Sequence, residues 1–235
     1  MSAPIVVDCL SHTSLNLMEN LRRLCSALRA TVIKRSNQKR QKLQRLEDQK
    51  TGRKQPMENK VILVTGSTDG IGKQTALGLA SMAAQVNLHG RDREKAHAVL
   101  EEIRYKTGNN RLGLLIADFS SQKQIVKLAA DIKERHDRLH VLINNAGTFM
   151  RERKLTEDGI EMTFAVNYMA PFILTSELLG LLKESASSRI INVASVAHWN
   201  AKIDWNNLQG ERGYDGFQAY CFVKIRHNSL YLHPC

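Results

Sequence analysis

The chain has 235 residues, an apolar fraction of 43% and a formal net charge of +11, which allows one large domain with a tail or two small domains. Residues 1–57 hold 12 Lys and Arg against 4 Asp and Glu, so this segment carries +8 of the charge and the remainder only +3, which argues against a nucleic-acid-binding domain. The four cysteines lie far apart without metal-ligand spacing, which indicates reduced thiols in a reducing compartment and no metal site. They are Cys9, Cys25, Cys221 and Cys235.

The sequence of the N-terminal segment predicts an amphipathic helix that is followed by a basic stretch. Leucines at 17, 21, 24 and 28 recur at helical spacing, which predicts a helix over roughly 14–33. Residues 34–54 are basic and Gln-rich, and they predict an exposed helix or a disordered linker. We therefore expect a basic extension over 1–57 and a nucleotide-binding domain over 58–235, with the catalytic unit beginning near Met57.

Three functions are open for this extension: contact with a membrane surface, a mitochondrial-type presequence, or a nucleic-acid arm. Asp8 and Glu19 argue against a presequence, and the lack of interleaved aromatic residues argues against nucleic-acid binding. We favour a solvated tail with one amphipathic helix. No apolar run is long enough to span a bilayer, and the secretory-signal pattern is missing. A cytoplasmic location, or one peripheral to an intracellular membrane, is expected.

A glycine-rich turn follows the first predicted strand, the apolar run over residues 61–64. Strand, glycine turn and helix begin a nucleotide-binding βαβ unit, although an ordinary strand–turn–helix connection is the alternative. Gly66 permits a tight turn, Gly70 lets the backbone approach a pyrophosphate, and Gly72 lets the helix pack closely on the strand. The helix N-terminus presents N–H groups to the phosphates. The same turn supplies three further candidate cofactor-binding residues: Ser67, Asp69 and Ile71.

The rest of the chain alternates strands with helices. Predicted strands cover 85–89, 113–117, 139–144 and 189–193, and predicted helices cover 94–105, 122–136 and 161–183. The last helix is expected to bend or split at Pro171. This pattern predicts the α/β class: a Rossmann-type, doubly wound parallel sheet with right-handed crossovers and helices on both faces. Ligands are expected at the carboxyl ends of the strands.

The end of the second strand favours NADP over NAD. Gly90 stands where an acidic residue would hold the ribose 2′-hydroxyl, and Arg91 follows it. A guanidinium pairs bidentately with a phosphate, although Arg91 is alternatively a solvated loop charge and Asp92 a ribose contact. After the third strand, Asp118 is placed to accept from the adenine amino group, or else it caps the next helix, as Ser120 or Ser121 also could.

Small and amide residues end the fourth strand in the sequence NNAG. Small side chains leave room for the cofactor ribose, and amides can fix neighbouring strand ends, although Asn and Gly commonly end strands. The candidate cofactor-binding residues here are Asn144, Ala146 and Gly147.

The candidate chemical groups lie further along the chain. Tyr220 and Lys224 are one helical turn apart, and an ammonium beside a phenol favours the phenolate, which suits an acid/base at neutral pH. Ser195 follows the fifth strand, where its hydroxyl could hold the substrate oxygen. Asn167 lies on the long helix and could anchor a water in a proton relay. Taken singly, a Tyr and a Lys at this spacing are more often a surface pair, a Ser after a strand is more often a cap, and an Asn within a helix is more often solvated.

Taken together, these motifs resemble the short-chain dehydrogenase/reductase family in their order and spacing. The resemblance runs from about Asn59 to Lys224 and rests on TGSTDGIG (65–72), NNAG (144–147), Asn167, Ser195 and Tyr220-x-x-x-Lys224. It implies a hydride-transferring oxidoreductase with Tyr220 as acid/base. It further implies that Lys224 binds the nicotinamide ribose and tunes Tyr220, that Ser195 positions the substrate, and that Asn167 supports the relay. Tyr220 and Lys224 therefore also count as cofactor-binding candidates.

Three details resemble the retinol-dehydrogenase-like branch of that family: HGRD after the second strand, residues 158–164 before Asn167, and residues 204–210 before the Tyr region. The branch implies lipophilic alcohols, aldehydes or ketones as substrates, usually with NADP.

The sequence also departs from the family. Val223 stands where a small residue is usual, and residues 225–235 show no helix periodicity before the chain stops. This resembles a truncated product that lacks the last two strands, which would expose the fifth strand as an edge and leave little turnover. The alternatives are thus an active oxidoreductase, an impaired isoform that binds nucleotide or a partner without turnover, and an interaction protein that works through its N-terminal helix. A homo-oligomer is also open.

Overall fold

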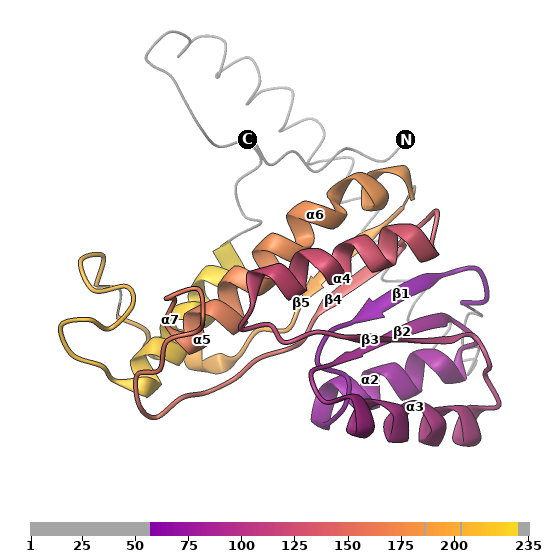
Figure 1. The fold of residues 1–235 in the computed structure, drawn as a ribbon, viewed down its shortest axis with the longest axis horizontal. Helices are drawn as coiled ribbons and strands as arrows, with labels where there is room; N and C mark the ends of the chain where they lie inside the picture. Colours follow the sequence, from indigo (N-terminus) through magenta and orange to yellow (C-terminus); the bar gives the residue numbers. More distant parts are fainter. Residues whose placement is uncertain (1–56, 186, 203, 230–235) are drawn as a thin grey trace, which may run out of the picture. The chain divides into compact units, whose positions relative to one another are not determined.

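The computed structural model describes residues 57–185, 187–202 and 204–229. The helix predicted over 14–33 and the basic stretch after it lie outside these residues, so the division at residue 57 stays a prediction. The described residues contain a five-stranded parallel sheet in the order β3-β2-β1-β4-β5 (Figure 1). This confirms the predicted α/β class.

The elements alternate as expected. The strands are β1 (Val61–Val64), β2 (Gln85–Gly90), β3 (Leu112–Ile116), β4 (Val141–Asn144) and β5 (Arg189–Asn192). The α-helices are α2 (Gly70–Ser81), α3 (Arg93–Thr107), α4 (Gln122–Arg135), α5 (Met162–Phe164), α6 (Ala170–Glu184) and α7 (Gly216–Ser229). Two further segments are a π-helical turn, η1 (Ala165–Met169), and a 3-10 helix, η2 (Val196–Asn200).

Helices cover both faces of the sheet, with α2 and α3 on one side and α4 and α6 on the other (Figure 1). Neighbouring residues of β1 point to opposite faces, so Leu63 packs towards α4 and α6 while Ile62 and Val64 pack towards α2 and α3. All three are buried. A strand buried on both faces reads as an unbroken apolar run, which is why the first strand was recognisable in the sequence.

The predicted break in the long helix is a π-helical turn. The N–H of Ala170 donates to the carbonyl of Ala165, five residues back, and Pro171 follows at once. Proline has no N–H to give to the carbonyl of Asn167, so an uninterrupted α-helix would lose that hydrogen bond in any case. The helix changes from π to α just before Pro171 without splitting, so the predicted disturbance takes the form of a change of helix type and not of a break in the chain of turns.

The continuous helical stretch Met162–Glu184 is 23 residues long and apolar enough to cross a membrane by length and composition. Its side chains instead form the core under the sheet, since Leu174, Leu178 and Leu182 are buried against α4 and the strands. A core helix of a doubly wound domain passes the same test of length and composition, so we assign this helix to the core.

Two expectations about local structure need correction. The sequence after Lys224 shows no helical periodicity, yet α7 continues to Ser229. The reason is tertiary packing earlier in the same helix, where Cys221, Phe222, Val223 and Lys224 are all buried, because most of the stability of a protein helix comes from such packing. Strand ends also differ by one or two residues from those predicted, because strand boundaries depend on pairing partners.

Candidate active site

The glycine turn after β1 holds a shape that larger residues would disturb. Gly66 has a φ of +61°, in the left-handed region, and a Cβ placed on it would lie 2.7 Å from Cα of Ala146. A Cβ on Gly72 would collide with the carbonyl oxygen of Gly66 and the side-chain amide of Asn145. The turn is thus pressed against the end of β4, and Gly72 is needed for this contact rather than for the predicted packing of the helix on its own strand.

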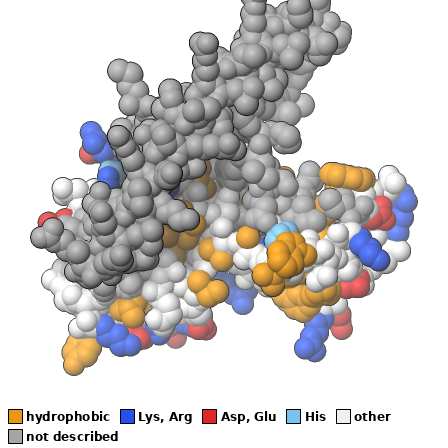
Figure 2. Space-filling view, turned by 180° about the vertical axis from the view of Figure 1, so that it is seen from behind, with side chains coloured by type: hydrophobic (Ala, Val, Ile, Leu, Met, Phe, Trp, Pro, Cys, Tyr) orange, Lys and Arg blue, Asp and Glu red, His pale blue; other side chains and the backbone are white. Residues whose placement is uncertain are grey.

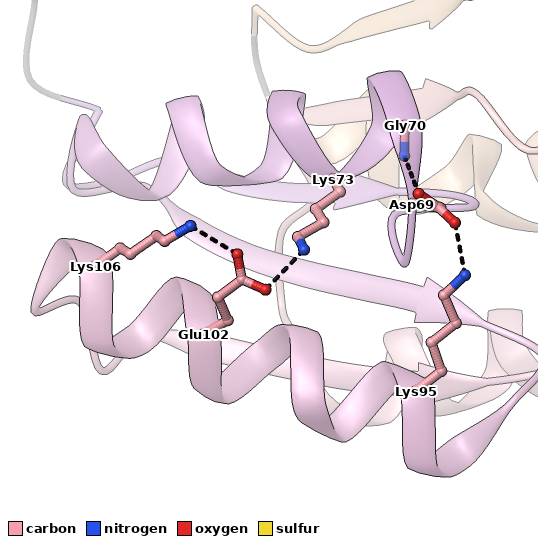
Figure 3. A network of polar contacts seen from close by, with 6 residues as sticks. All are labelled: Asp69, Gly70, Lys73, Lys95, Glu102 and Lys106. Carbon is pink, nitrogen blue, oxygen red and sulfur yellow. Dashed lines mark hydrogen bonds and ion pairs between the residues drawn. The ribbon is translucent and has the colours of Figure 1, made fainter.

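The N-terminus of α2 faces outward from this turn. Asp69, Gly70 and Ile71 are exposed, whereas Ser67 is fully buried, with its hydroxyl bonded to the backbone of His89. Asp69 caps the helix by accepting from the Gly70 N–H (2.8 Å), and its other oxygen accepts from Nζ of Lys95 (2.6 Å; Figure 3). The Lys95 ammonium, and next the Gly70 N–H, hold the pKa of Asp69 below its usual value. Helix N–H groups and exposed glycine backbone at this point form a surface suited to phosphates.

The buried side chain of His89 supports the glycine turn, and His89 was not among the predicted site residues. Its ring is buried and lies between Gly66 N, 3.1 Å from Nδ1, and Ala117 O, 3.1 Å from Nε2. The ring stacks on Phe119 with 4.2 Å between centroids. One imidazole therefore joins the ends of β1, β2 and β3. The sequence signal was a histidine at the end of an apolar strand and at the start of the motif HGRD, which does not reveal its bonds.

The end of β2 shows why Gly90 is a glycine. A Cβ there would lie 2.4 Å from Cγ2 of Thr68, so an acidic residue at this position would require the Thr68 side chain to shift. Arg91 is exposed directly after the strand. Asp92, the alternative ribose contact, caps α3 by accepting from the Lys95 N–H (3.0 Å). Of the two side chains, Arg91 is the one without a capping role.

In the loop after β3, neither Asp118 nor Ser121 makes a side-chain capping bond to α4. Asp118 accepts from the Ser120 N–H (2.9 Å) and so shapes the loop rather than capping α4. Ser121 occupies the N-cap position but makes no side-chain capping bond. The Gln122 N–H instead donates to a carboxylate oxygen of Asp158 (2.9 Å), 36 residues away. A cap supplied from so far along the chain leaves no local sequence signal.

The NNAG segment ties three strand ends together. Asn144 is buried and donates to Asn192 Oδ1 (2.9 Å) on β5 and to Thr175 Oγ1 (3.2 Å) on α6. Asn145, absent from the predicted set, donates to the carbonyls of Thr65 (2.9 Å) and Gly66 (3.0 Å). The amides thus fix neighbouring strand ends, and Asn145 fixes the glycine turn itself.

Gly147 and Asn167 meet beside this segment. The Asn167 side chain is fully buried and clamps Thr148, accepting from its N–H and donating to its carbonyl, both at 2.7 Å. A Cβ on Gly147 would lie 2.8 Å from Asn167 Oδ1 and 3.8 Å from Nζ of Lys224. The exposed Gly147 backbone therefore borders both the relay candidate and the lysine.

Lys224 and Tyr220 lie on one side of α7, as their spacing predicted. Nζ of Lys224 donates to the carbonyl of Val193 (3.2 Å), at the end of β5, and lies 5.6 Å from the centroid of the Tyr220 ring. The lysine is 5% exposed, and burial lowers its pKa. The Tyr220 ring in turn meets Phe149 edge-on, with 5.8 Å between centroids. The tyrosine, the ammonium, Gly147 and Asn167 thus form one cluster.

Ser195 stands at the start of η2, which packs against α7. Its hydroxyl accepts from the Ala197 N–H (3.2 Å) and so caps η2, which was the plainer alternative for this residue. A hydroxyl that accepts one N–H keeps its own O–H available for a substrate oxygen. The structure thus places Ser195 on an element next to Tyr220 without fixing a contact between them.

Glu161 holds the loop before α7 in place through hydrogen bonds, and it was not among the site residues predicted from the sequence. Its buried carboxylate caps α5 through the Thr163 N–H (2.8 Å) and the Phe164 N–H (2.7 Å), and accepts from the Tyr214 hydroxyl (3.0 Å). Gln209 accepts from the Glu161 N–H (3.0 Å). Burial raises the pKa of Tyr214, which keeps it a donor. Glu161 therefore links the loop over 204–215 to the helix that carries Asn167.

The residues present fit a dinucleotide. The exposed N-terminus of α2, the close-packed Gly66 and Gly72, and the Cβ-free edge of Gly147 leave room for phosphates and ribose along the carboxyl ends of the strands. Beyond Gly147, the buried ammonium of Lys224 lies beside the half-buried phenol of Tyr220. Such an arrangement can hold a nucleotide and move a proton at its end.

Comparison with known proteins gives the following matches. Residues 60–207 match the family described as short chain dehydrogenase. The chain is 46% identical to retinol dehydrogenase 11 of Homo sapiens over 166 residues, which are 71% of this chain and 52% of that protein. It is 44% identical to retinol dehydrogenase 13 of Homo sapiens over 167 residues, 71% of this chain and 50% of that protein. Among solved structures, the RhlG/NADP active-site complex of Pseudomonas aeruginosa is 30% identical with a TM-score of 0.59, covering 74% of this chain and 66% of that one. The chain spans about half the length of the curated relatives it matches.

Proposed function

Because the chain belongs to the short-chain dehydrogenase/reductase family and is similar to its retinol dehydrogenases, we propose that it transfers hydride between NADP(H) and a lipophilic alcohol, aldehyde or ketone. The observation that carries the proposal is the cluster of Tyr220, Lys224, Gly147 and Asn167 at the carboxyl ends of the strands. NADP, when bound, supplies the carbon that gives or takes the hydride.

Tyr220 is the acid/base in this proposal. During reduction of a carbonyl its hydroxyl gives a proton to the substrate oxygen, and during oxidation of an alcohol its phenolate takes one. Lys224 stands 5.6 Å from the phenol ring with its ammonium held on Val193 O, so its positive charge favours the phenolate. The Ser195 hydroxyl orients the substrate oxygen, and Asn167 holds the backbone beside Gly147 in place for the proton relay.

Nucleotide binding is assigned to the turn and the strand ends. Gly66, Gly70, Ile71 and Gly72 border the pyrophosphate, and Asp118 lies at the adenine end. Arg91 pairs with the 2′-phosphate, and Gly90 supplies no acid that would favour NAD. The NADP complex of RhlG, at 30% identity, is consistent with this choice.

Apolar side chains near Tyr220 favour a lipophilic substrate. Phe149 touches the Tyr220 ring and is 46% exposed, and Val196 and Trp199 on η2, next to α7, are 75% and 80% exposed. Exposed apolar groups are scattered over the face shown in Figure 2, and η2, which carries Val196 and Trp199, packs against the helix of Tyr220. An apolar rim of this kind fits the alcohols named for the curated relatives. Peripheral membrane contact through residues 14–33, a cytoplasmic or membrane-peripheral location and a homo-oligomer remain predictions.

The test is NADPH oxidation by the chain with all-trans-retinal and with acetaldehyde as a water-soluble control. We expect turnover of the lipophilic aldehyde, with Tyr220→Phe lowering it at least about 100-fold while NADPH binding is kept. Equal turnover by Tyr220→Phe, or a preference for acetaldehyde, would remove the proposal. NADPH binding without turnover of any lipophilic carbonyl would favour the impaired isoform, which the assembled cluster does not favour.

A further inference from the structure

A short segment after NNAG, residues 148–150, lies against α7 near the phenol of Tyr220. Phe149, in the middle of the segment, meets the Tyr220 ring edge-on. At one end, the backbone of Thr148 is clamped by the buried side chain of Asn167. The segment is therefore fixed to the helical stretch that carries Asn167, and the Tyr220 ring rests on it.

The other end of the segment is fixed by Tyr214. The Tyr214 hydroxyl donates to two acceptors, the carbonyl oxygen of Met150 (3.2 Å) and Oε1 of Glu161 (3.0 Å). Thr163 Oγ1 lies 3.3 Å from the same hydroxyl. Glu161 and Thr163 are both buried at the start of α5, which packs against α7 (Figure 1). A hydroxyl with three partners around its oxygen is held in one position.

Tyr214 also stands just before the point at which α7 begins. Asp215 follows it and accepts from the Phe217 N–H (2.8 Å). Gly216, the first residue of α7, is buried, and a Cβ placed on it would collide with the carbonyl oxygen of Met150. The entry of the helix is thus in close contact with the same carbonyl that accepts from the Tyr214 hydroxyl. This contact sets how near α7 lies to the segment.

A second contact holds α7 further along. Nζ of Lys224 donates to the carbonyl of Val193 (3.2 Å), at the end of β5. Tyr220 lies between this contact and the entry of the helix. Because α7 is a continuous helix, Tyr220 and Lys224 move together when the entry shifts. What changes is the position of the phenol relative to Phe149 and the strand ends.

We propose that Tyr214 is a positioning residue: its hydroxyl, held by Glu161, fixes the entry of α7 on the Met150 carbonyl and so places the Tyr220 phenol for proton transfer. This rests on the proposed function, in which Tyr220 is the acid/base. It gives the loop over 204–215 a part in turnover that requires no contact with the substrate. A misplacement of about 1 Å can lower a rate roughly 100-fold, so a partial shift of the helix entry is enough.

The test is Tyr214→Phe, which removes only the hydroxyl. The reaction is the reduction of all-trans-retinal by NADPH, and kcat is expressed per NADPH-binding site so that unfolded protein is not counted. We expect kcat to fall roughly tenfold, while the Kd for NADPH and the KM for retinal stay within about twofold. The pH dependence of kcat should keep its midpoint, because Lys224 moves with Tyr220. Tyr105→Phe, at a position that is 92% exposed on α3, is the matched control and should leave kcat within about twofold.

Gly216→Ala is the second variant, because its Cβ pushes the helix entry away from Met150 while the Tyr214 hydroxyl is kept. It should lower kcat per site to a similar degree. The double variant of Tyr214→Phe and Gly216→Ala should fall by no more than about twofold beyond the worse single variant, since both changes disturb one contact.

Two results would overturn the inference while the proposed function stands. One is an unchanged kcat per site in both variants, or the loss of NADPH binding by both, which would show that these contacts only support the fold. The other is a shifted midpoint of the pH dependence in Tyr214→Phe, which would show that Tyr214 acts on the charge of the site and not on its geometry. If the unmodified chain binds NADPH without turning over any lipophilic carbonyl, the proposed function fails and this inference fails with it.

Discussion

The backbone N–H of Gly66 donates to Nδ1 of His89 across 3.1 Å, joining residues 23 positions apart. Because Nδ1 accepts, the proton of the neutral ring is on Nε2, which donates to the carbonyl of Ala117. The glycine turn therefore depends on one tautomer of one buried imidazole, and this sets the first two predictions.

Replacing His89 by leucine removes an acceptor from Gly66 and a donor from Ala117. Because two backbone groups lose their partners inside the domain, we expect the free energy of unfolding to fall by about 2–4 kcal/mol. NADPH affinity should fall as well, since the turn is no longer held. His97→Leu, at an exposed position on α3, is the control and should change neither quantity. Urea unfolding and NADPH titration give both readings, and unchanged stability in His89→Leu would contradict the assigned contacts.

The stability of the domain should decrease as the pH falls below neutral, in part through His89. Burial lowers the pKa of His89 to about 4 from the usual value of 6.5, so the unfolded chain takes up the proton first. The stabilisation is complete above pH 6.5 and is lost progressively as the pH falls to about 4, by on the order of 3 kcal/mol for a side chain that is 3% exposed. His89→Gln does not titrate and should lose correspondingly less stability between these pH values. Parallel urea curves for the two proteins at every pH would refute this.

Replacing Lys224 should raise the stability of the fold and lower the turnover of the enzyme. Burial lowers the pKa of this lysine, and no carboxylate pairs with it among the described residues, so its charge is costly to the fold. Lys224→Met keeps the length of the side chain without the charge. We expect the free energy of unfolding to rise by about 1–2 kcal/mol and turnover to fall at least about 100-fold. Thermal unfolding and the retinal assay test this, and a destabilised variant would show that the ammonium supports the fold.

Arg91→Ala should weaken NADP selectively. A charge-assisted contact with the 2′-phosphate is worth about 1.5–3 kcal/mol, whereas NAD lacks that group. The expected result is weaker NADP binding with NAD affinity unchanged, measured by titration of both cofactors. Arg104→Ala, on the exposed side of α3 in a pair with Glu101, is the control. An equal drop for both cofactors would exclude the assignment of Arg91.

Two glycines should respond in opposite directions to alanine. Gly147→Ala puts a Cβ 2.8 Å from Asn167 Oδ1, so the clamp on Thr148 must shift, and both NADPH affinity and the melting temperature should fall. Gly180→Ala, in the interior of α6 with nothing within 4 Å of the new Cβ, should stabilise the domain by about 0.5–1 kcal/mol. If both variants behave alike, the close approach at Gly147 does not matter for the site.

The sequence predicted the sheet, the glycine turn and the spacing of Tyr220 and Lys224 because each has a local signal. Apolar runs predict buried strands, and residues four apart share a helix face. His89, Asn145 and Glu161 lie within the motifs HGRD, NNAG and 158–164, but the partner of each could not be predicted from these motifs. Each is a polar residue whose partners lie on distant segments, and a single polar residue at a strand or helix end looks the same whether it is solvated or bonded. The contact of Lys95 with Asp69 was missed for the same reason.

The π-helical turn over Ala165–Met169 has a consequence for helical phase. One residue more than an α-turn shifts every later side chain by about 100° around the axis. The apolar stripe of Leu174, Leu178 and Leu182 must face the sheet, while Asn167 must face Thr148. The extra residue lets one continuous helix meet both requirements. The direction in which the Asn167 side chain points can therefore change without changing which side chains of α6 face the sheet. If a single residue were deleted from this turn, the helix could keep either the Asn167–Thr148 contact or the leucine stripe against the sheet, but not both.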